Sequence, residues 1–116
     1  MPDKFGDKIR LQHALDATDK IQRYLKGIKK DDFLADDMTQ DACIRQLQVI
    51  GESVNRIQSR TQKAYPNIPW AKIIGLRNVV VHEYFGINGK IIWSIIKKDL
   101  PLIKVQFKEL IVQLPD

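Results

Sequence analysis

The stretch "RNVVVHEYFGIN", residues 77–88, decides whether the chain is all-helical or contains a strand. Three consecutive valines followed by aromatic residues have the composition of a β-strand. No other segment offers a convincing partner strand, and a lone strand would leave its backbone N–H and C=O groups unpaired. We therefore predict that residues 79–81 are helical, because packing outweighs the weak helix propensity of valine, and that the fold is all-α.

Apolar residues at steps of three and four predict helices before this stretch. The first covers about residues 7–28, with a core stripe of Leu11, Ala14, Thr18, Ile21, Leu25 and Ile28. A polar connector over 29–37 leads to a second helix, which is predicted to begin at the N-cap Thr39 and to run to about Lys63. Its core stripe is Leu47, Ile50, Val54 and Ile57.

Proline and glycine divide the second half of the chain. Pro69 is well placed to begin a third helix, which includes the valines and runs to about His82. An apolar fourth segment follows Asn88-Gly89, and Asp99 and Pro101 mark a kink or a new start before the last segment. The chain is therefore predicted to be one domain that folds as an antiparallel bundle of four or five helices.

The composition is that of an ordinary soluble domain. The 116 residues are 44% hydrophobic and 28% charged, and no apolar run approaches the ~20 residues of a membrane helix. The beginning of the chain lacks the apolar core of a signal peptide, so we expect a cytoplasmic protein. The single Cys43 fits a reducing compartment and is interpreted as a buried apolar residue. The net charge of +5 weakly favours a polyanionic partner such as RNA or DNA.

Five residues of the third helix form a candidate site. On a regular helix, Asn78 and His82 are i,i+4 neighbours whose side chains can meet. Arg77 lies ~100° from Asn78 and ~140° from His82 around the helix axis. Arg77 and His82 can converge on one substrate if the helix ends near His82 or if two copies face each other across a symmetric dimer. The small residues Ala71 and Gly75 on the same face would let another backbone approach.

These residue types suit the cleavage of a phosphodiester bond in RNA. An imidazole with a pKa near ~6.5 can deprotonate a ribose 2′-OH or protonate a leaving 5′-oxygen. A guanidinium can stabilise the extra negative charge of the transition state, and Asn78 can orient the imidazole or bind a phosphate oxygen. His82 has no Cys or Asp pair at ligand spacing, which argues against a metal site. We therefore expect metal-independent chemistry and no cofactor.

The same residues also have an ordinary structural interpretation. One histidine and one arginine on a helix are common, and a hydrogen-bonded His82 beside an exposed Arg77 would need no function. Taken alone, Tyr84 is interpreted as an aromatic residue at the edge of the core. His13 has no potential catalytic or ligand residue at a characteristic spacing in the sequence, so it is interpreted as a surface residue. The residues alone leave both interpretations open.

A family resemblance favours the first interpretation. Residues 77–82 match the R-x4-6-H motif of the HEPN superfamily, with a polar Asn directly after the Arg. Extended to Tyr84, the pattern R-N-x-x-x-H-x-Y resembles the HepT-like toxins of HepT/MntA toxin–antitoxin pairs. The resemblance extends to the Ile50-Gly51-Glu52 step, to Pro69-Trp70 and to the pattern of Trp93 followed by Asp99-Leu100-Pro101.

The resemblance implies a function, a partner and an assembly. It implies a HEPN-like homodimer whose two motifs meet at a cleft, with Arg77 and His82 catalytic and Asn78 supporting. It implies a toxin of a type II or type VII-like pair that cleaves tRNA or mRNA as an endoribonuclease. The antitoxin would be an MNT-type nucleotidyltransferase that adds AMP to Tyr84. Glu52 is either a supporting residue behind the site or an exposed acid paired with Arg56.

Two alternatives remain from the sequence. The chain could be a HEPN module that has lost catalysis and binds a nucleotidyltransferase. It could also be a plain dimeric helical scaffold in which Ala71 and Gly75 matter only for packing.

Overall fold

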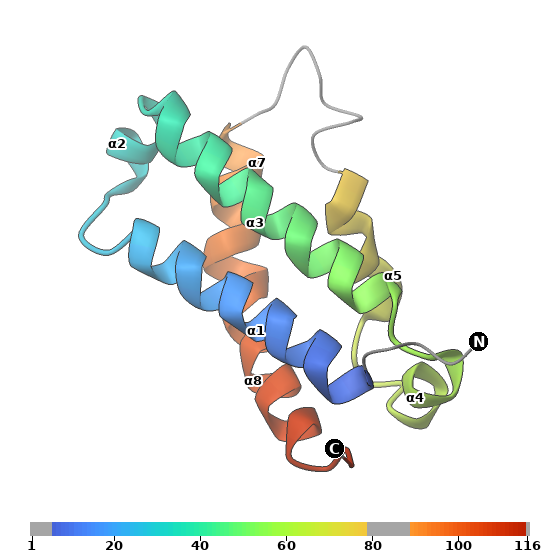
Figure 1. The fold of residues 1–116 in the computed structure, drawn as a ribbon. Coiled ribbons are helices and arrows are strands. Elements are labelled where there is room, and N and C mark those ends of the chain that lie inside the picture. Colours follow the sequence, from blue (N-terminus) through green and yellow to red (C-terminus); the bar gives the residue numbers. More distant parts are fainter. Residues whose placement is uncertain (1–5, 79–88, 116) are drawn as a thin grey trace.

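A computed structural model describes residues 6–78 and 89–115, and these residues are helical with no strand among them (Figure 1). The predicted all-α class is therefore confirmed. The valines of the opening stretch lie outside the described residues, so their predicted helical conformation stays a prediction. No helix in the described part of the chain is both long enough and apolar enough to span a membrane.

Helix α1, Asp7–Tyr24, is shorter than predicted. It ends because Gly27 adopts a φ of +77°, which is in the left-handed region that glycine favours, and the chain turns there. Its predicted core stripe is confirmed: Leu11, Ala14, Thr18 and Ile21 are fully buried. Thr18 is tolerated in the core because its hydroxyl donates to the Leu15 carbonyl at 2.7 Å.

Helix α3, Asp37–Asn55, begins at a different cap from the predicted one. Asp36 is the N-cap, and its carboxylate accepts bonds from the Thr39 N–H at 3.1 Å and the Thr39 hydroxyl at 2.6 Å. These two bonds, led by the one from the hydroxyl, lower the pKa of Asp36. The connector before it, predicted as irregular, contains the short helix α2, Lys30–Leu34, which buries Phe33.

The prediction of one helix to Lys63 was wrong, because the chain breaks after Asn55 and restarts as α4, Ser59–Ala64. The break is stabilised from a distant part of the sequence. The Asp7 carboxylate accepts from the Gln58 N–H at 3.1 Å and from the Thr61 hydroxyl, so the first residue of α1 caps α4. A partner more than fifty residues away leaves no local pattern in the sequence.

The third predicted helix begins where expected and then changes type. Pro69 is the N-cap of α5, Trp70–Ile74, which continues as the 3₁₀ helix η1, Gly75–Asn78. After the gap in the described residues, α7, Gly89–Ser94, runs through a π-helical turn, η2, Ile95–Asp99, into α8, Leu100–Ile111. The predicted irregularity near Pro101 is this π turn, which widens the helix just before the residue that lacks an N–H.

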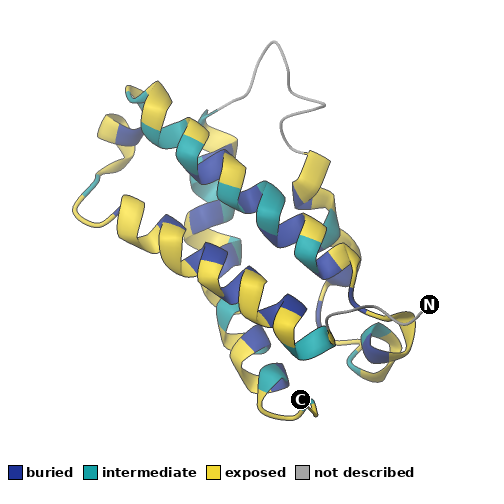
Figure 2. Cartoon of the chain, in the orientation of Figure 1, coloured by how far each residue is buried: buried dark blue, intermediate teal, exposed yellow. Residues whose placement is uncertain are grey.

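The helices pack in two layers. α1 and α3 lie side by side, and the continuous α7–α8 helix and α5 cover their inner faces (Figure 1). Buried residues line the surfaces where the layers meet (Figure 2). Trp70 and Phe107 stack with ring centroids 6.4 Å apart, and Lys72 pairs with Asp99 at 3.3 Å, so α5 is held against the α7–α8 helix.

The cap that α1 gives α4 should stabilise the whole fold. Asp7→Ala removes both bonds from the start of α4, and we expect it to lower the free energy of unfolding by about 1–2 kcal/mol. Urea denaturation measures this change. Asp16→Ala is the control, because Asp16 is exposed and accepts a bond from the exposed Gln12 amide one turn away on the same helix. Equal stability of the two variants would contradict the assignment.

Candidate functional site

The described part of the candidate site is the 3₁₀ turn η1, which carries Arg77 and Asn78. Both side chains are exposed, whereas the preceding Leu76 is buried and anchors the turn. A guanidinium and an amide are therefore both exposed on consecutive residues of this turn. This arrangement can hold the oxygens of a phosphate group.

Gly51 of α3 lets this turn approach the bundle. A Cβ atom built on Gly51 would lie 2.4 Å from the Arg77 backbone nitrogen and 3.0 Å from both the Arg77 Cβ and the Ile74 carbonyl oxygen. Real Cβ atoms do not come so close to backbone atoms, so only glycine fits there. The close contact between α3 and η1 fixes the position from which the Arg77 side chain leaves the backbone.

The small residues that sequence reasoning chose do not have this role within the chain. A Cβ on Gly75 would meet no atom within 4 Å in the described part of the chain, and Ala71 is exposed. The close backbone approach occurs at Gly51 instead. The Ile50-Gly51-Glu52 step was a visible signal, but only the tertiary structure reveals which backbone it admits.

His82 and Tyr84 lie outside the described residues, so their positions relative to Arg77 stay predictions. Glu52 is exposed on α3, and it lines a shallow pocket of about 140 Å³ together with Arg10, Val49, Ser53 and Arg56. Its place directly after Gly51 puts its backbone next to the contact with η1. A supporting role for Glu52 toward the site stays a prediction.

Cys43, His13 and metal-ligating residues are the other candidate groups. Cys43 is fully buried, and burial raises the pKa of its thiol to about 11, which keeps it protonated at neutral pH. His13 is exposed on α1, as predicted. Within residues 6–78 and 89–115, no three His, Cys, Asp or Glu side chains are grouped so as to hold a metal ion.

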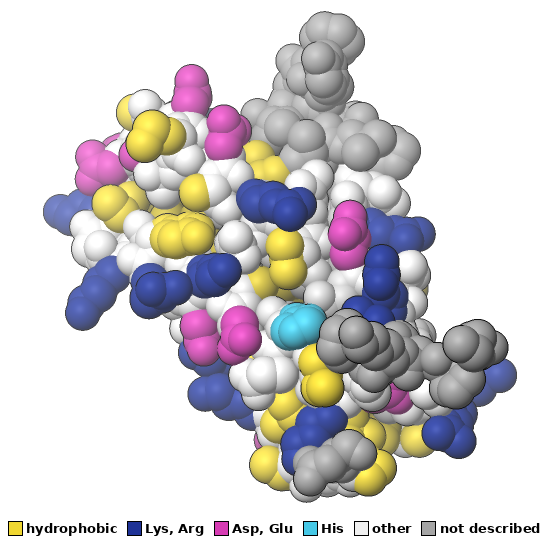
Figure 3. Space-filling view, viewed as in Figure 1, with side chains coloured by type: hydrophobic (Ala, Val, Ile, Leu, Met, Phe, Trp, Pro, Cys, Tyr) yellow, Lys and Arg dark blue, Asp and Glu magenta, His cyan; other side chains and the backbone are white. Residues whose placement is uncertain are grey.

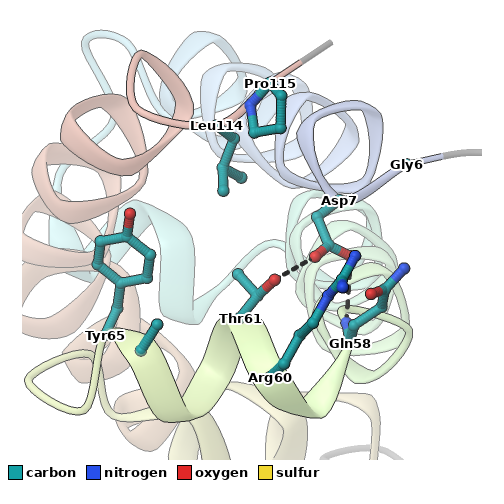
Figure 4. A pocket seen from close by; sticks show the side chains of 9 residues that line it. Gly6, Asp7, Gln58, Arg60, Thr61, Tyr65, Leu114 and Pro115 are labelled. Carbon is teal, nitrogen blue, oxygen red and sulfur yellow. Dashed lines mark hydrogen bonds between the residues drawn. The ribbon is translucent and has the colours of Figure 1, made fainter.

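A pocket at the end of the bundle is not lined by Arg77. It has a volume of about 480 Å³, and it lies between the start of α1, helix α4 and the end of the chain (Figure 4). Its best placed polar groups are the carboxylate of Asp7 and the hydroxyl of Thr61, which are bonded to each other. These groups serve the cap of α4, so this pocket is not the candidate site.

A groove between α1 and α3 was missed by sequence reasoning. One part of it, of about 420 Å³, is lined by His13, Asp16, Lys20 and Arg45, among others. Lys and Arg side chains are spread over this face of the molecule, with acidic side chains among them (Figure 3). The basic side chains on this face could contact a polyanion. The sequence did not reveal the groove, because acidic and basic residues alternate along each of the two helices.

Comparison with known families identifies the chain. Residues 14–110 match the model of the HepT-like family, described as ribonuclease HepT-like. This match runs from the middle of α1 almost to the end of α8 and includes Gly51 and Arg77. The chain therefore belongs to the HepT-like family, and the resemblance drawn from its motif is confirmed.

Individual relatives agree with the family match. The chain is 34% identical over 107 residues to "Probable ribonuclease HepT" of Thermococcus cleftensis, which covers 92% of the chain and 97% of that protein. It is 36% identical over 101 residues to "Putative RNase TTE0752" of Caldanaerobacter subterraneus, covering 87% and 90%. It is also 32% identical, over 92% of its length, to "Gamma-glutamylcyclotransferase and putative RNase MJ0434" of Methanocaldococcus jannaschii, of which it spans only 48%. No solved structure gives a significant match.

The contact between Gly51 and η1 predicts a sharp contrast between two glycines. Gly51→Ala forces α3 and η1 apart, and we expect it to lower the free energy of unfolding by about 1–3 kcal/mol. Gly75→Ala adds a methyl group to open space in a helical backbone, and should leave stability unchanged or raise it by about 0.5–1 kcal/mol. Denaturant titration of both variants tests this pair. A stable Gly51→Ala would show that the close approach is unnecessary.

Proposed function

We propose that the chain is the toxin of a toxin–antitoxin pair and acts in the cytoplasm as a metal-independent endoribonuclease on tRNA or mRNA. The observation that carries the proposal is the family match over residues 14–110 combined with the exposed Arg77 and Asn78 on a turn fixed against α3. The formal charge of +5 and the basic side chains along the groove between α1 and α3 support binding of an RNA backbone.

The proposed reaction is internal transesterification of RNA. His82 accepts the proton of a ribose 2′-OH, and the 2′-oxygen attacks the neighbouring phosphorus. The bond from phosphorus to the 5′-oxygen breaks, and that oxygen takes a proton from a histidine. Arg77 stabilises the negative charge that develops on the phosphate oxygens, and Asn78 orients the imidazole or the phosphate. The products are a 2′,3′-cyclic phosphate and a 5′-hydroxyl.

A homodimer fits this reaction better than a single chain. Two proton transfers are required, and each chain supplies one motif histidine. If two chains face each other across a two-fold axis, one His82 acts as the base and the other as the acid. The exposed Ala71 and Gly75 would allow the two motif surfaces to approach closely.

The proposed antitoxin is an MNT-type nucleotidyltransferase that modifies Tyr84. The phenolic oxygen of Tyr84 attacks the α-phosphorus of ATP, AMP is attached and pyrophosphate leaves. Tyr84 is two residues from His82 in the sequence, so the added adenylate would block the cleft and repel RNA phosphates.

A cleavage assay in EDTA tests the nuclease directly. Arg77→Ala and His82→Ala should each reduce cleavage of total RNA at least ~100-fold, because each removes a charge or proton transfer from the transition state. Arg60→Ala, which removes an exposed arginine from α4, should cleave as wild type does. The ends of the fragments should carry cyclic phosphate.

Two results would overturn this assignment. Folded Arg77→Ala and His82→Ala proteins that cleave like wild type would remove the proposed catalytic residues. A wild-type protein of the expected intact mass that leaves RNA uncut, yet binds a nucleotidyltransferase, would identify the chain as a non-catalytic binding module.

The modification has its own test. Incubation with ATP and an MNT-type nucleotidyltransferase should add mass in steps of one AMP and abolish cleavage. Tyr84→Phe removes only the phenolic oxygen, so this variant should still cleave RNA and gain no mass. AMP addition to Tyr84→Phe at the wild-type rate would place the modification on another residue.

A further inference from the structure

The outer face of α8 carries large apolar side chains that nothing in the described part of the chain covers. Leu102 is 60% exposed, Val105 52% and Val112 79%. The other faces of this helix are engaged. Leu100, Ile103, Phe107 and Leu110 face the core, and Lys104 pairs with Asp19 of α1 at 2.8 Å. The exposed apolar residues therefore lie on a separate face, directed away from the bundle.

These residues belong to a stripe with a definite spacing. Lys98, Leu102, Val105, Glu109 and Val112 follow one another at steps of four, three, four and three. This is the spacing of the contact positions in paired helices. We define these five residues as the α8 stripe; its first member is in the π turn η2 and the others are in α8 or directly after it. From Lys98 to Val112 there are fourteen steps along the helix, so the stripe is about 21 Å long.

The stripe is complementary to itself when two copies run antiparallel. A two-fold axis between residues 103 and 104 places Leu102 opposite Val105 of the partner subunit and Val105 opposite the partner's Leu102. The same axis places Lys98 opposite the partner's Glu109, and this pair occurs twice by symmetry. An apolar centre is thus flanked at both ends by opposite charges.

Other arrangements of two stripes are less favourable. In a parallel pair, each Lys98 would face another Lys98, and each Glu109 another Glu109. If the antiparallel pair slides by seven residues in one direction, Lys98 of one copy lies opposite Leu102 of the other. If it slides in the other direction, Glu109 of one copy lies opposite Val105 of the other, so in both cases a charge faces an apolar side chain. Neither Lys98 nor Glu109 has an ion-pair partner among residues 6–78 and 89–115, so both are free to bind across an interface.

We propose that the α8 stripe is a self-association surface at which two copies of this chain pair antiparallel. The symmetric arrangement of charges and apolar residues about one point favours a second copy of this chain as the occupant. Arg77 lies on η1 rather than on this stripe. A chain that also associates through its motif surface would therefore form assemblies of more than two copies. The proposal stands whether or not the chain cleaves RNA.

Charge reversal tests the pairing through the mass of the assembly. Lys98→Glu and Glu109→Lys each place like charges opposite one another, and each should weaken self-association by about tenfold or more. The double variant Lys98→Glu/Glu109→Lys restores opposite charges and should recover the wild-type assembly. Leu102→Asp should abolish this association. Sedimentation velocity over a concentration series measures the masses, and circular dichroism checks that each variant is folded.

Lys20→Glu is the matched control, because it makes the same charge change on an exposed residue of α1, in the groove between α1 and α3, and should leave the assembly mass unchanged. The proposal is overturned if Leu102→Asp assembles like wild type, or if the double variant is as weak as the single ones. It is also overturned if the wild-type protein is monomeric at about 100 μM, the highest concentration of the series.

Discussion

The contact between the backbone of α3 at Gly51 and the backbone of Arg77 is the constraint on which the candidate site depends. A Cβ built on Gly51 would lie 2.4 Å from the Arg77 nitrogen, so any other residue there would force the two backbones apart. The contact brings a short 3₁₀ turn against a long, well-packed helix. A short turn has few hydrogen bonds of its own, so a rigid neighbour must hold it if its side chains are to keep a fixed direction.

The rest of the fold supports this contact from two sides. α3 is held by its buried stripe against α1, and its start is fixed by the Asp36 cap. α5, which leads into η1, is held against the α7–α8 helix by the stacking of Trp70 on Phe107 and by the pair of Lys72 with Asp99. Arg77 is thus an exposed side chain on a backbone that is restrained on both sides. The backbone that carries this side chain therefore needs no ordering when a ligand binds, although the side chain itself does.

The sequence predicted the features that depend on local pattern. The all-α class, the core stripes of the first two long helices and the start of α5 at Pro69 follow from helical periodicity and from the stereochemistry of proline. The features it missed depend on distant partners. The break after Asn55 is stabilised by Asp7, and the η1 contact needs Gly51, so neither is encoded in the neighbouring residues. The correct cap of α3, Asp36, was a local signal, and it was overlooked in favour of Thr39, to which it is bonded.

We propose that the packing of η1 on α3 holds Arg77 where it acts on RNA. The most direct measurement is the single-turnover rate of RNA cleavage by Gly51→Ala, at a temperature where this variant is fully folded. Asp7→Ala is the control, because it destabilises the fold at a place far from η1. The account predicts that Gly51→Ala cleaves much more slowly than wild type, while Asp7→Ala cleaves at the wild-type rate. Equal rates for folded Gly51→Ala and wild type would contradict it.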